Sequence, residues 1–159
     1  KRFSGSDYYR YLIDLALKFK LKIFFFGHDE NTLKKISVKN PGLHIAGYHS
    51  GYDYSDEKVI SLVNQSNPDI LVVGLGFPVQ EHWIVENREK ISCRAVIAVG
   101  DGIKVFAGTK IRGPKILRMI GLEWFIRFLS HPKRYFRRYI IGNPLFLYRI
   151  IKYKFRKFG

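Results

Sequence analysis

The chain has 159 residues, enough for a domain with a real core, and 47% of them are hydrophobic, which excludes an intrinsically disordered chain. A single cysteine, Cys93, excludes an internal disulfide. The formal net charge is +15, and from Lys110 to Gly159 fourteen Lys or Arg residues stand against one acid, Glu123. This cationic end of the chain favours a polyanionic partner: nucleic acid, anionic lipid or a diphosphate substrate.

The first hundred residues alternate between helical and strand-like segments. Helical patterns lie at residues 6–20, 28–40, 55–67 and 78–91, and apolar strand-like runs lie at 21–27, 43–52, 68–76 and 93–100. Such close alternation predicts a parallel sheet with helices on both faces, which is an α/β, Rossmann-like arrangement. We expect this core to occupy residues 1–109.

A basic helical appendage is expected over residues 110–159. The pattern predicts helices at 113–129, 131–142 and 143–159, and the last two each have a proline near the first turn. In the last helix an apolar stripe comprises Leu147, Ile151, Phe155 and Phe158, and a basic stripe comprises Arg149, Lys152 and Arg156. A helix with these two stripes after a globular core is typical of a segment that lies on an anionic membrane surface.

The segment "GLGFPVQEHW" places turn-forming residues directly after the most apolar strand. In a parallel α/β sheet, ligands bind beyond the carboxyl ends of the strands. Gly74 and Gly76 allow a tight turn and close approach of a ligand, and Pro78 suits the first position of a helix. The first N–H groups of that helix are expected to face a phosphate or sugar oxygen, with Gln80 and Glu81 at the same mouth. An ordinary strand-to-helix turn explains these residues equally well.

Two further groups of polar residues are candidates for ligand contacts. His49 and Tyr52 lie in a loop at a strand end, where they either contact the nucleotide or sugar or pack the loop. Arg134, Arg137 and Arg138 are spaced to share one helix face, and guanidinium groups bind a diphosphate through paired hydrogen bonds. Solvated or lipid-facing charge explains each arginine equally well.

Several spaced motifs occur in order along the chain. G-x-G-x-P-x-Q-E-x-W begins at Gly74, and R-x-P, G-L-E-W, P-x-R and R-Y follow between Arg112 and Tyr139. Earlier, "RFSGSDYY" and "GYHSGYDYSDE" are similar to R-x-x-G-S-D and G-x-x-x-G-Y-F segments. Together these motifs resemble the WecG/TagA/CpsF glycosyltransferases, also called glycosyltransferase family 26, over almost the whole chain.

The resemblance implies a bacterial enzyme of cell-envelope polysaccharide synthesis. Such an enzyme transfers a hexose, often N-acetylmannosamine, from a UDP-sugar to a polyprenyl-diphosphate-linked acceptor, with inversion and with neither a metal nor another cofactor. It implies that Arg112, Arg134 and Arg138 act in catalysis, with Arg127 as a weaker member. It also implies a cytoplasmic, peripheral position on the inner face of the membrane, where the basic appendage completes the active site.

Two departures from the family pattern concern acidic residues. Lys104 stands where the family commonly has an aspartate, and Asp101 lies three residues earlier. The resemblance places the family's general-base aspartate upstream of the matched motifs, and no residue here matches it. We therefore expect slow turnover by this chain alone, unless Asp101 or Glu81 serves as the base or a partner chain supplies the missing segment. Family members also associate, so a homo-oligomer is a further expectation.

Two other functions fit the same composition. Basic residues interleaved with aromatic ones also suit single-stranded nucleic acid. The aliphatic stripes of the last helix argue against that interpretation, because nucleic acid does not require them. A non-catalytic partner that docks a split transferase onto the membrane is the third hypothesis.

Overall fold

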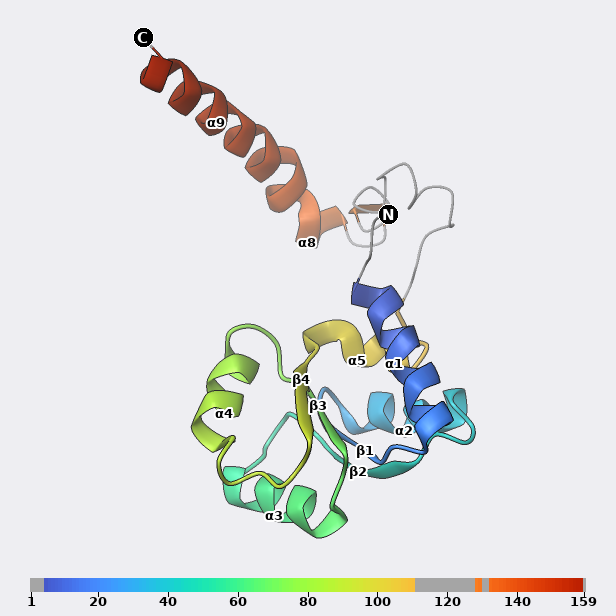
Figure 1. Cartoon of the computed structure of the whole chain (residues 1–159). Helices are drawn as coiled ribbons and strands as arrows, with labels where there is room; N and C mark the ends of the chain where they lie inside the picture. The colour runs from blue at the N-terminus through green and yellow to red at the C-terminus, as the bar shows by residue number, and fades with distance from the viewer. Residues whose placement is uncertain (1–4, 111–127, 130–131, 159) are drawn as a thin grey trace. The chain divides into compact units, whose positions relative to one another are not determined.

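The computed structural model describes residues 5–110, 128–129 and 132–158. The chain divides into two compact units, Lys1–Lys110 and Ile111–Gly159, called here the α/β unit and the basic unit. Figure 1 shows the elements of each unit.

A four-stranded parallel sheet forms the centre of the α/β unit. Its strands are β1 (Ile23–Gly27), β2 (Ile45–His49), β3 (Ile70–Gly74) and β4 (Ala95–Ala98), in the order β2-β1-β3-β4. After β1, the chain adds β2 on one side of β1 and then adds β3 and β4 on its other side. The direction in which strands are added to the sheet therefore reverses between β1 and β3. This is the topological switch point, where doubly wound sheets bind their ligands. The predicted α/β class with a parallel sheet is confirmed.

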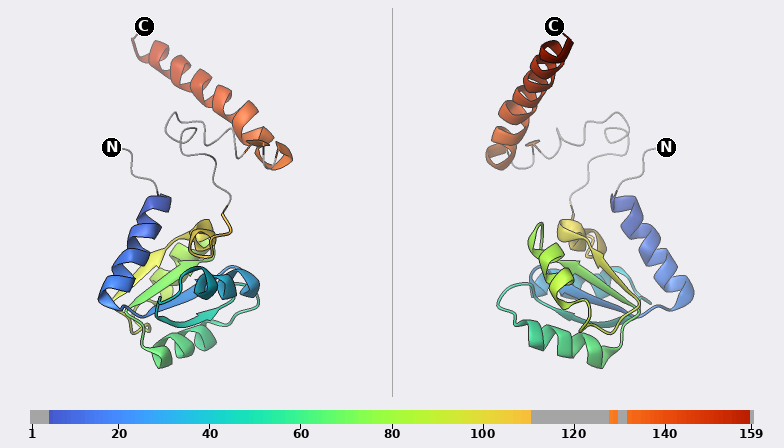
Figure 2. Two further views of the ribbon diagram at one scale, coloured as in Figure 1. Left: turned by 90° about the vertical axis from the view of Figure 1, so that its right-hand side faces the viewer. Right: turned by 60° about the vertical axis from the view of Figure 1, so that its left-hand side comes forward.

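Helices cover both faces of this sheet, as Figures 1 and 2 show. One face carries α1 (Gly5–Phe19), α2 (Glu30–Lys39) and α5 (Ile103–Phe106), and the other carries α3 (Asp56–Ser66) and α4 (Val79–Asn87). Successive side chains of β1 point to opposite faces of the sheet, and these side chains are apolar, so both faces of the sheet are apolar at this strand. Phe25 packs in the first layer against Phe106, whereas Phe26 packs in the second against Trp83.

The sequence pattern misplaced two element boundaries at the carboxyl ends of strands. The helix expected from residue 28 begins at Glu30, because His28 has a left-handed backbone (φ +63°) and Asp29 caps the helix. The strand-like run predicted at residues 93–100 is shorter in the structure, where β4 covers Ala95–Ala98 and is followed by a 3-10 turn (Gly100–Gly102) and α5.

The basic unit contains a helical path from Pro132 to Phe158. It consists of α8 (Pro132–Phe136), a π-helical segment (Arg137–Gly142) and α9 (Asn143–Phe158). The predicted boundary between residues 142 and 143 coincides with the start of α9, and Pro144 falls in the first turn of this helix, where a missing N–H costs little. Every side chain from Asn143 to Lys154 is exposed. Within the described residues, none of the helices combines the length and the apolar character needed to cross a bilayer.

Candidate functional site at the carboxyl edge of the sheet

The carboxyl ends of β1 and β3 meet at the switch point, where both strands end in glycine. Gly27 pairs with Gly74, and a Cβ added to Gly27 would lie 2.5 Å from the carbonyl carbon and oxygen of Gly74. Gly27 also has φ +122°, a conformation that L side chains rarely adopt. Glycine therefore lets the two strand ends approach closely, and the loops that leave them start side by side.

The loop after β3 opens toward solvent at Gly76 and then closes into α4. Gly76 has φ +90° with no atom within 4 Å of an added Cβ, so its backbone conformation, not packing, requires glycine. Pro78 follows a cis peptide bond and precedes the first helical residue, Val79. The N–H of Gln80 donates to the carbonyl oxygen of Gly76 at 3.0 Å. The expectation that this N–H faces a ligand is therefore wrong, because the turn itself uses it.

Gln80 connects the loop after β3 with the turn after β4. Its side chain is buried, its Oε1 accepts from the N–H of Gly100 at 2.8 Å, and its Nε2 donates to Oε1 of Glu81 at 2.8 Å. These two contacts hold Gly100 and Glu81 beside each other at the carboxyl edge. The predicted contact between Gln80 and a substrate stays a prediction.

Glu81 has a buried carboxylate oxygen that lacks a donor. Its Oε2 is inaccessible to solvent and has no hydrogen-bond partner within the described part of the chain. Burial of a carboxylate oxygen without a donor is costly, so such atoms are uncommon unless a bound group supplies the hydrogen bond. This unpaired oxygen in the first turn of α4 is the feature of the carboxyl edge that most directly indicates a ligand.

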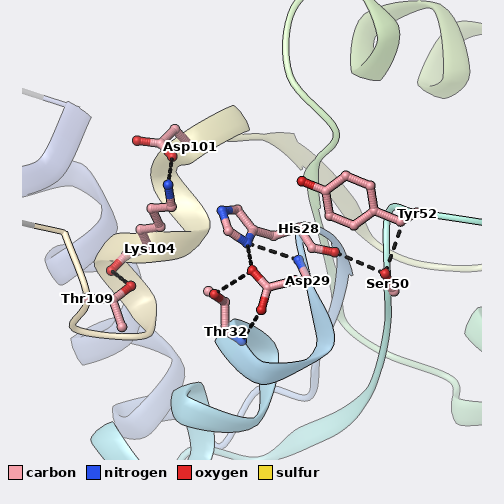
Figure 3. A network of polar contacts seen from close by, with 8 residues as sticks. All are labelled: His28, Asp29, Thr32, Ser50, Tyr52, Asp101, Lys104 and Thr109. Carbon is pink, nitrogen blue, oxygen red and sulfur yellow. Dashed lines mark hydrogen bonds and ion pairs between the residues drawn. The ribbon is translucent and has the colours of Figure 1, made fainter. Parts of the chain in front are cut away.

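The loop after β1 holds a histidine against a carboxylate (Figure 3). Nδ1 of His28 lies 2.5 Å from Oδ2 of Asp29. Asp29 also accepts from the N–H and the hydroxyl of Thr32, each at 2.8 Å. These two hydrogen bonds and, to a smaller extent, the contact with His28 lower the pKa of Asp29 from 3.8 to about 2, even though partial burial opposes the shift. Asp29 is therefore an anion at neutral pH.

The loop after β2 supports the backbone of His28. The carbonyl oxygen of His28 accepts from the N–H of Gly51 at 2.9 Å and from the hydroxyl of Ser50 at 3.1 Å, and Ser50 Oγ accepts from the N–H of Tyr52. Nδ1 of His49 contacts the carbonyl oxygen of Ser50 at 2.8 Å. Of the two residues predicted in a loop, His49 is instead the last residue of β2, whereas Tyr52 lies in the loop that holds His28, as Figure 3 shows.

Sequence reasoning overlooked three residues of this edge: His28, Asp29 and Ser50. They follow the carboxyl ends of β1 and β2, as Gly76 follows the end of β3. The rule that directed attention to the ends of β3 and β2 also applies to β1. It was not applied to β1 because His28 and Asp29 were assigned to a helix.

Asp101, the weak substitute for a general base, lies in the turn after β4. Its carboxylate pairs with Lys104 at 3.0 Å and with Lys110 at 3.6 Å. The lysine that replaces the family's aspartate therefore neutralises the nearest acid in sequence. A catalytic role for Asp101 stays a prediction, and these two ion pairs compete with it.

The structure leaves several predicted site residues undescribed. Arg112 and Arg127 lie outside the described residues, as does most of the helix expected at residues 113–129. Only the backbone is described for a group of predicted arginine and membrane residues: Arg134, Arg138, Phe155, Arg156 and Phe158. The remaining predicted members are exposed: Arg137, Leu147, Arg149, Ile151 and Lys152. In the described ranges, no three His, Cys, Asp or Glu side chains are grouped to hold a metal ion.

Comparisons with known proteins give one consistent result. The family model described as "Glycosyl transferase WecG/TagA/CpsF family" matches residues 1–158. A relative from Staphylococcus aureus (strain MW2) is 34% identical over 137 residues, which are 84% of this chain and 53% of the relative. Relatives from Bacillus subtilis (strain 168) and Bacillus spizizenii (strain ATCC 23059 / NRRL B-14472 / W23) are 32% and 30% identical, over 95% and 96% of this chain and 60% of each relative.

These three relatives share one name, N-acetylglucosaminyldiphosphoundecaprenol N-acetyl-β-D-mannosaminyltransferase. The chain spans between about half and three fifths of their length. The similarity therefore includes the sheet, the carboxyl-edge loops and the basic unit.

Proposed function

The chain belongs to the WecG/TagA/CpsF family of glycosyl transferases, and from this membership we propose that it forms the nucleotide-sugar-binding part of a hexosyltransferase. The donor is a UDP-sugar, with N-acetylmannosamine or a related hexose. The acceptor is a sugar linked to a polyprenyl diphosphate, as in the names of the three relatives. Transfer inverts the anomeric centre without a bound metal and serves bacterial cell-envelope polysaccharide synthesis.

The observation that carries this proposal is the set of polar groups at the switch point. The open turn at Gly76, the unpaired Oε2 of Glu81 and the oriented ring of His28 all occur where β1 and β3 end. A sugar hydroxyl or an N-acetyl N–H is a suitable donor for Glu81, and a sugar nucleotide supplies such groups. Residues 1–109 form this binding core in the proposal.

The basic unit supplies positive charge in this proposal. A departing UDP gains negative charge, and preorganised guanidinium groups stabilise such charge where water is excluded. Arg112, Arg134, Arg137 and Arg138 are the proposed source within residues 110–159. α9 binds the anionic inner face of the cytoplasmic membrane, where a polyprenyl-linked acceptor is held. Association with a second copy of the chain or with a partner chain is a further part of the proposal.

A transfer assay tests the proposed function. The purified chain is mixed with UDP-N-acetylmannosamine and a short-prenyl diphosphate N-acetylglucosamine, in the presence of phosphatidylglycerol vesicles. We expect calorimetry to detect UDP-sugar binding, and we expect slow formation of a β-linked disaccharide with release of UDP. GDP-mannose is the control donor and should not react. Absence of both UDP-sugar binding and transfer would contradict the proposal.

A variant links the assay to the carboxyl edge. Glu81→Ala removes the unpaired oxygen, so the affinity for the UDP-sugar should fall about tenfold, which corresponds to the loss of one hydrogen bond to a charged group. Lys35→Ala is the control, because Lys35 is exposed on α2. Equal UDP-sugar affinity of Glu81→Ala and Lys35→Ala would show that Glu81 does not contact the donor.

A further inference from the structure

We propose that Phe77 binds the nucleobase of the donor by stacking its ring on the base. The inference rests on the proposed function and assigns the part of the same site that holds the base. It follows from the exposure of Phe77, from the place of its loop at the switch point and from the contacts that join this loop to the loop after β2.

Phe77 exposes a large aromatic ring beside the candidate site. Among the large apolar side chains that the structure describes, it is the most exposed, at 85%. Val79, two residues later, is half-exposed, and Tyr52 in the loop after β2 is 65% exposed. A single exposed apolar side chain is ordinary, but several of them beside a ligand site indicate a contact surface.

The loops that carry Phe77 and Tyr52 adjoin each other. A Cβ added to Gly51 would lie 2.7 Å from Cδ2 of Leu75 and 2.8 Å from Cα of Gly27, so the loops after β1, β2 and β3 meet at this glycine. Tyr52 follows Gly51 directly, and Phe77 comes two residues after Leu75. The two exposed rings therefore belong to adjoining loops at the edge of the sheet that contains the switch point.

The turn before Phe77 is open to a ligand and yet fixed in place. A Cβ added to Gly76 would have no atom within 4 Å. The N–H of Gln80 donates to the carbonyl oxygen of Gly76, and the side chain of Gln80 accepts from the N–H of Gly100. A loop that is already ordered loses little freedom when a ligand packs on its side chain, so less binding free energy is lost.

The chemistry of the ring favours the base over the other parts of a sugar nucleotide. A phenyl ring has neither a charge nor a hydrogen-bond donor, so it does not suit a diphosphate. Its flat face suits a nucleobase, because every base has a flat π face on which an aromatic side chain packs. In the proposed function, Glu81 contacts the sugar and the arginines of the basic unit contact the diphosphate. Phe77 supplies the remaining kind of surface for the remaining part of the donor.

Calorimetry with UDP and UDP-N-acetylmannosamine tests the stacking. Phe77→Ala should lower the affinity of the 159-residue chain for both ligands by the same factor, about tenfold, the usual effect of removing an aromatic ring from a stacked base. Any affinity for pyrophosphate, which has no base, should not change. Val85→Ala is the control, because Val85 is an exposed apolar residue of α4 outside the turn. Equal UDP affinity of the two variants would overturn the proposal, as would a loss confined to the UDP-sugar.

Two conservative variants distinguish stacking from a general apolar contact. Phe77→Tyr keeps the flat ring and should keep the UDP affinity within about threefold of that of the unmodified chain. Phe77→Leu keeps apolar surface without the flat face, so it should lose most of the affinity that Phe77→Ala loses. Because the side chain is exposed, all three variants should fold, which circular dichroism checks. Weaker UDP binding by Phe77→Tyr than by Phe77→Leu would contradict stacking.

Fluorescence of Phe77→Trp reports the contact directly. The unmodified chain, which contains Trp83 and Trp124, gives the background emission. A base stacked on the new indole should quench its emission, so UDP should lower the difference between the two chains and pyrophosphate should not. An unchanged difference at saturating UDP would show that the ring does not meet the base.

The possible failures are distinguishable. UDP binding that is equal in Phe77→Ala and the unmodified chain would overturn the role of Phe77 and leave the proposed function intact. An unmodified chain with affinity for neither UDP nor the UDP-sugar would contradict both proposals. If Phe77→Ala instead weakens cosedimentation with phosphatidylglycerol vesicles and leaves UDP binding unchanged, the exposed ring contacts the membrane surface and the stacking proposal is wrong.

Discussion

At the scale of single residues, Gln80 is a structural connection within the carboxyl edge. Its side-chain amide joins the N–H of Gly100 to the carboxylate of Glu81, and the side chain is only 6% exposed. A buried amide with both of its groups engaged stabilises the loops that surround it, because each partner would otherwise lose its hydrogen bond. Any effect of Gln80 on a ligand therefore includes an effect through Gly100 and Glu81.

Replacement of this side chain should be costly. Gln80→Ala leaves the N–H of Gly100 and Oε1 of Glu81 without their partner, so the free energy of unfolding should fall by about 2–4 kcal/mol. Urea denaturation followed by circular dichroism measures the change. Val79→Ala is the matched control, because Val79 is the preceding residue and is 50% exposed. Its free energy of unfolding should change by only about 0.5 kcal/mol. Equal stability of the two variants would contradict this account of Gln80.

At the scale of elements, β1 and β3 define the site because they are neighbouring parallel strands that both end in glycine. The pair Gly27 and Gly74 has no side chains to separate the strands, and an added Cβ on Gly74 would lie 2.3 Å from Cδ1 of Ile103. α5 therefore also packs closely against the end of β3. The loops that carry His28 and Gly76 are positioned by this packing of strands and helix.

A side chain at Gly27 should lower the stability of the fold by more than backbone strain alone would. Gly27→Ala combines φ +122° with contacts of 2.5 Å to the backbone of Gly74, so we expect a loss of stability of about 3 kcal/mol or more. Gly42→Ala is the control: φ is +90° there, but the nearest atom, Cδ2 of Leu17, lies at 3.7 Å. Strain alone should cost about 1–2 kcal/mol. Thermal unfolding of both variants measures the difference, and a smaller loss in Gly27→Ala would refute the close approach.

At the scale of the whole molecule, charge and exposed apolar surface are concentrated in the basic unit. Residues 110–159 carry +13 of the net +15. α9 also exposes large apolar side chains, among them Leu147, Ile151 and Tyr153. Exposed apolar side chains interleaved with lysines and arginines are typical of helices that lie in a membrane interface. This combination supports the proposed membrane contact over a nucleic-acid contact, for which apolar side chains are not needed.

Vesicle binding separates these two partners. The chain should cosediment with phosphatidylglycerol vesicles more than with phosphatidylcholine vesicles, and less at high salt. Lys152→Ala should weaken the binding about fivefold, since each basic residue near the surface contributes about 1 kcal/mol. Ile151→Ser should also weaken it, whereas Lys35→Ala on α2 should not. Tighter binding to a single-stranded oligonucleotide than to the vesicles at the same salt concentration would instead support the nucleic-acid hypothesis.

The predicted part of the candidate site came from the ends of β3 and β2, and the missed residues are His28 and Asp29 after β1 and Ser50 after β2. The turn after β3 was found because two glycines and a proline mark it locally. His28 was not found, because its left-handed backbone depends on hydrogen bonds from Ser50 and Gly51, more than twenty residues away. No local pattern encodes such a contact.

By itself the sequence determined the alternation of strands and helices, the parallel sheet and the separation of a nearly neutral core from a basic end. These properties depend on the periodicity of neighbouring residues and on summed charge, which are local or additive. Only the tertiary structure decided the strand order, the switch point between β1 and β3, and the contacts of His28, Gln80 and Glu81. The physical reason is that these features arise from packing between segments distant in sequence, where backbone strain and buried hydrogen bonds depend on which elements become neighbours.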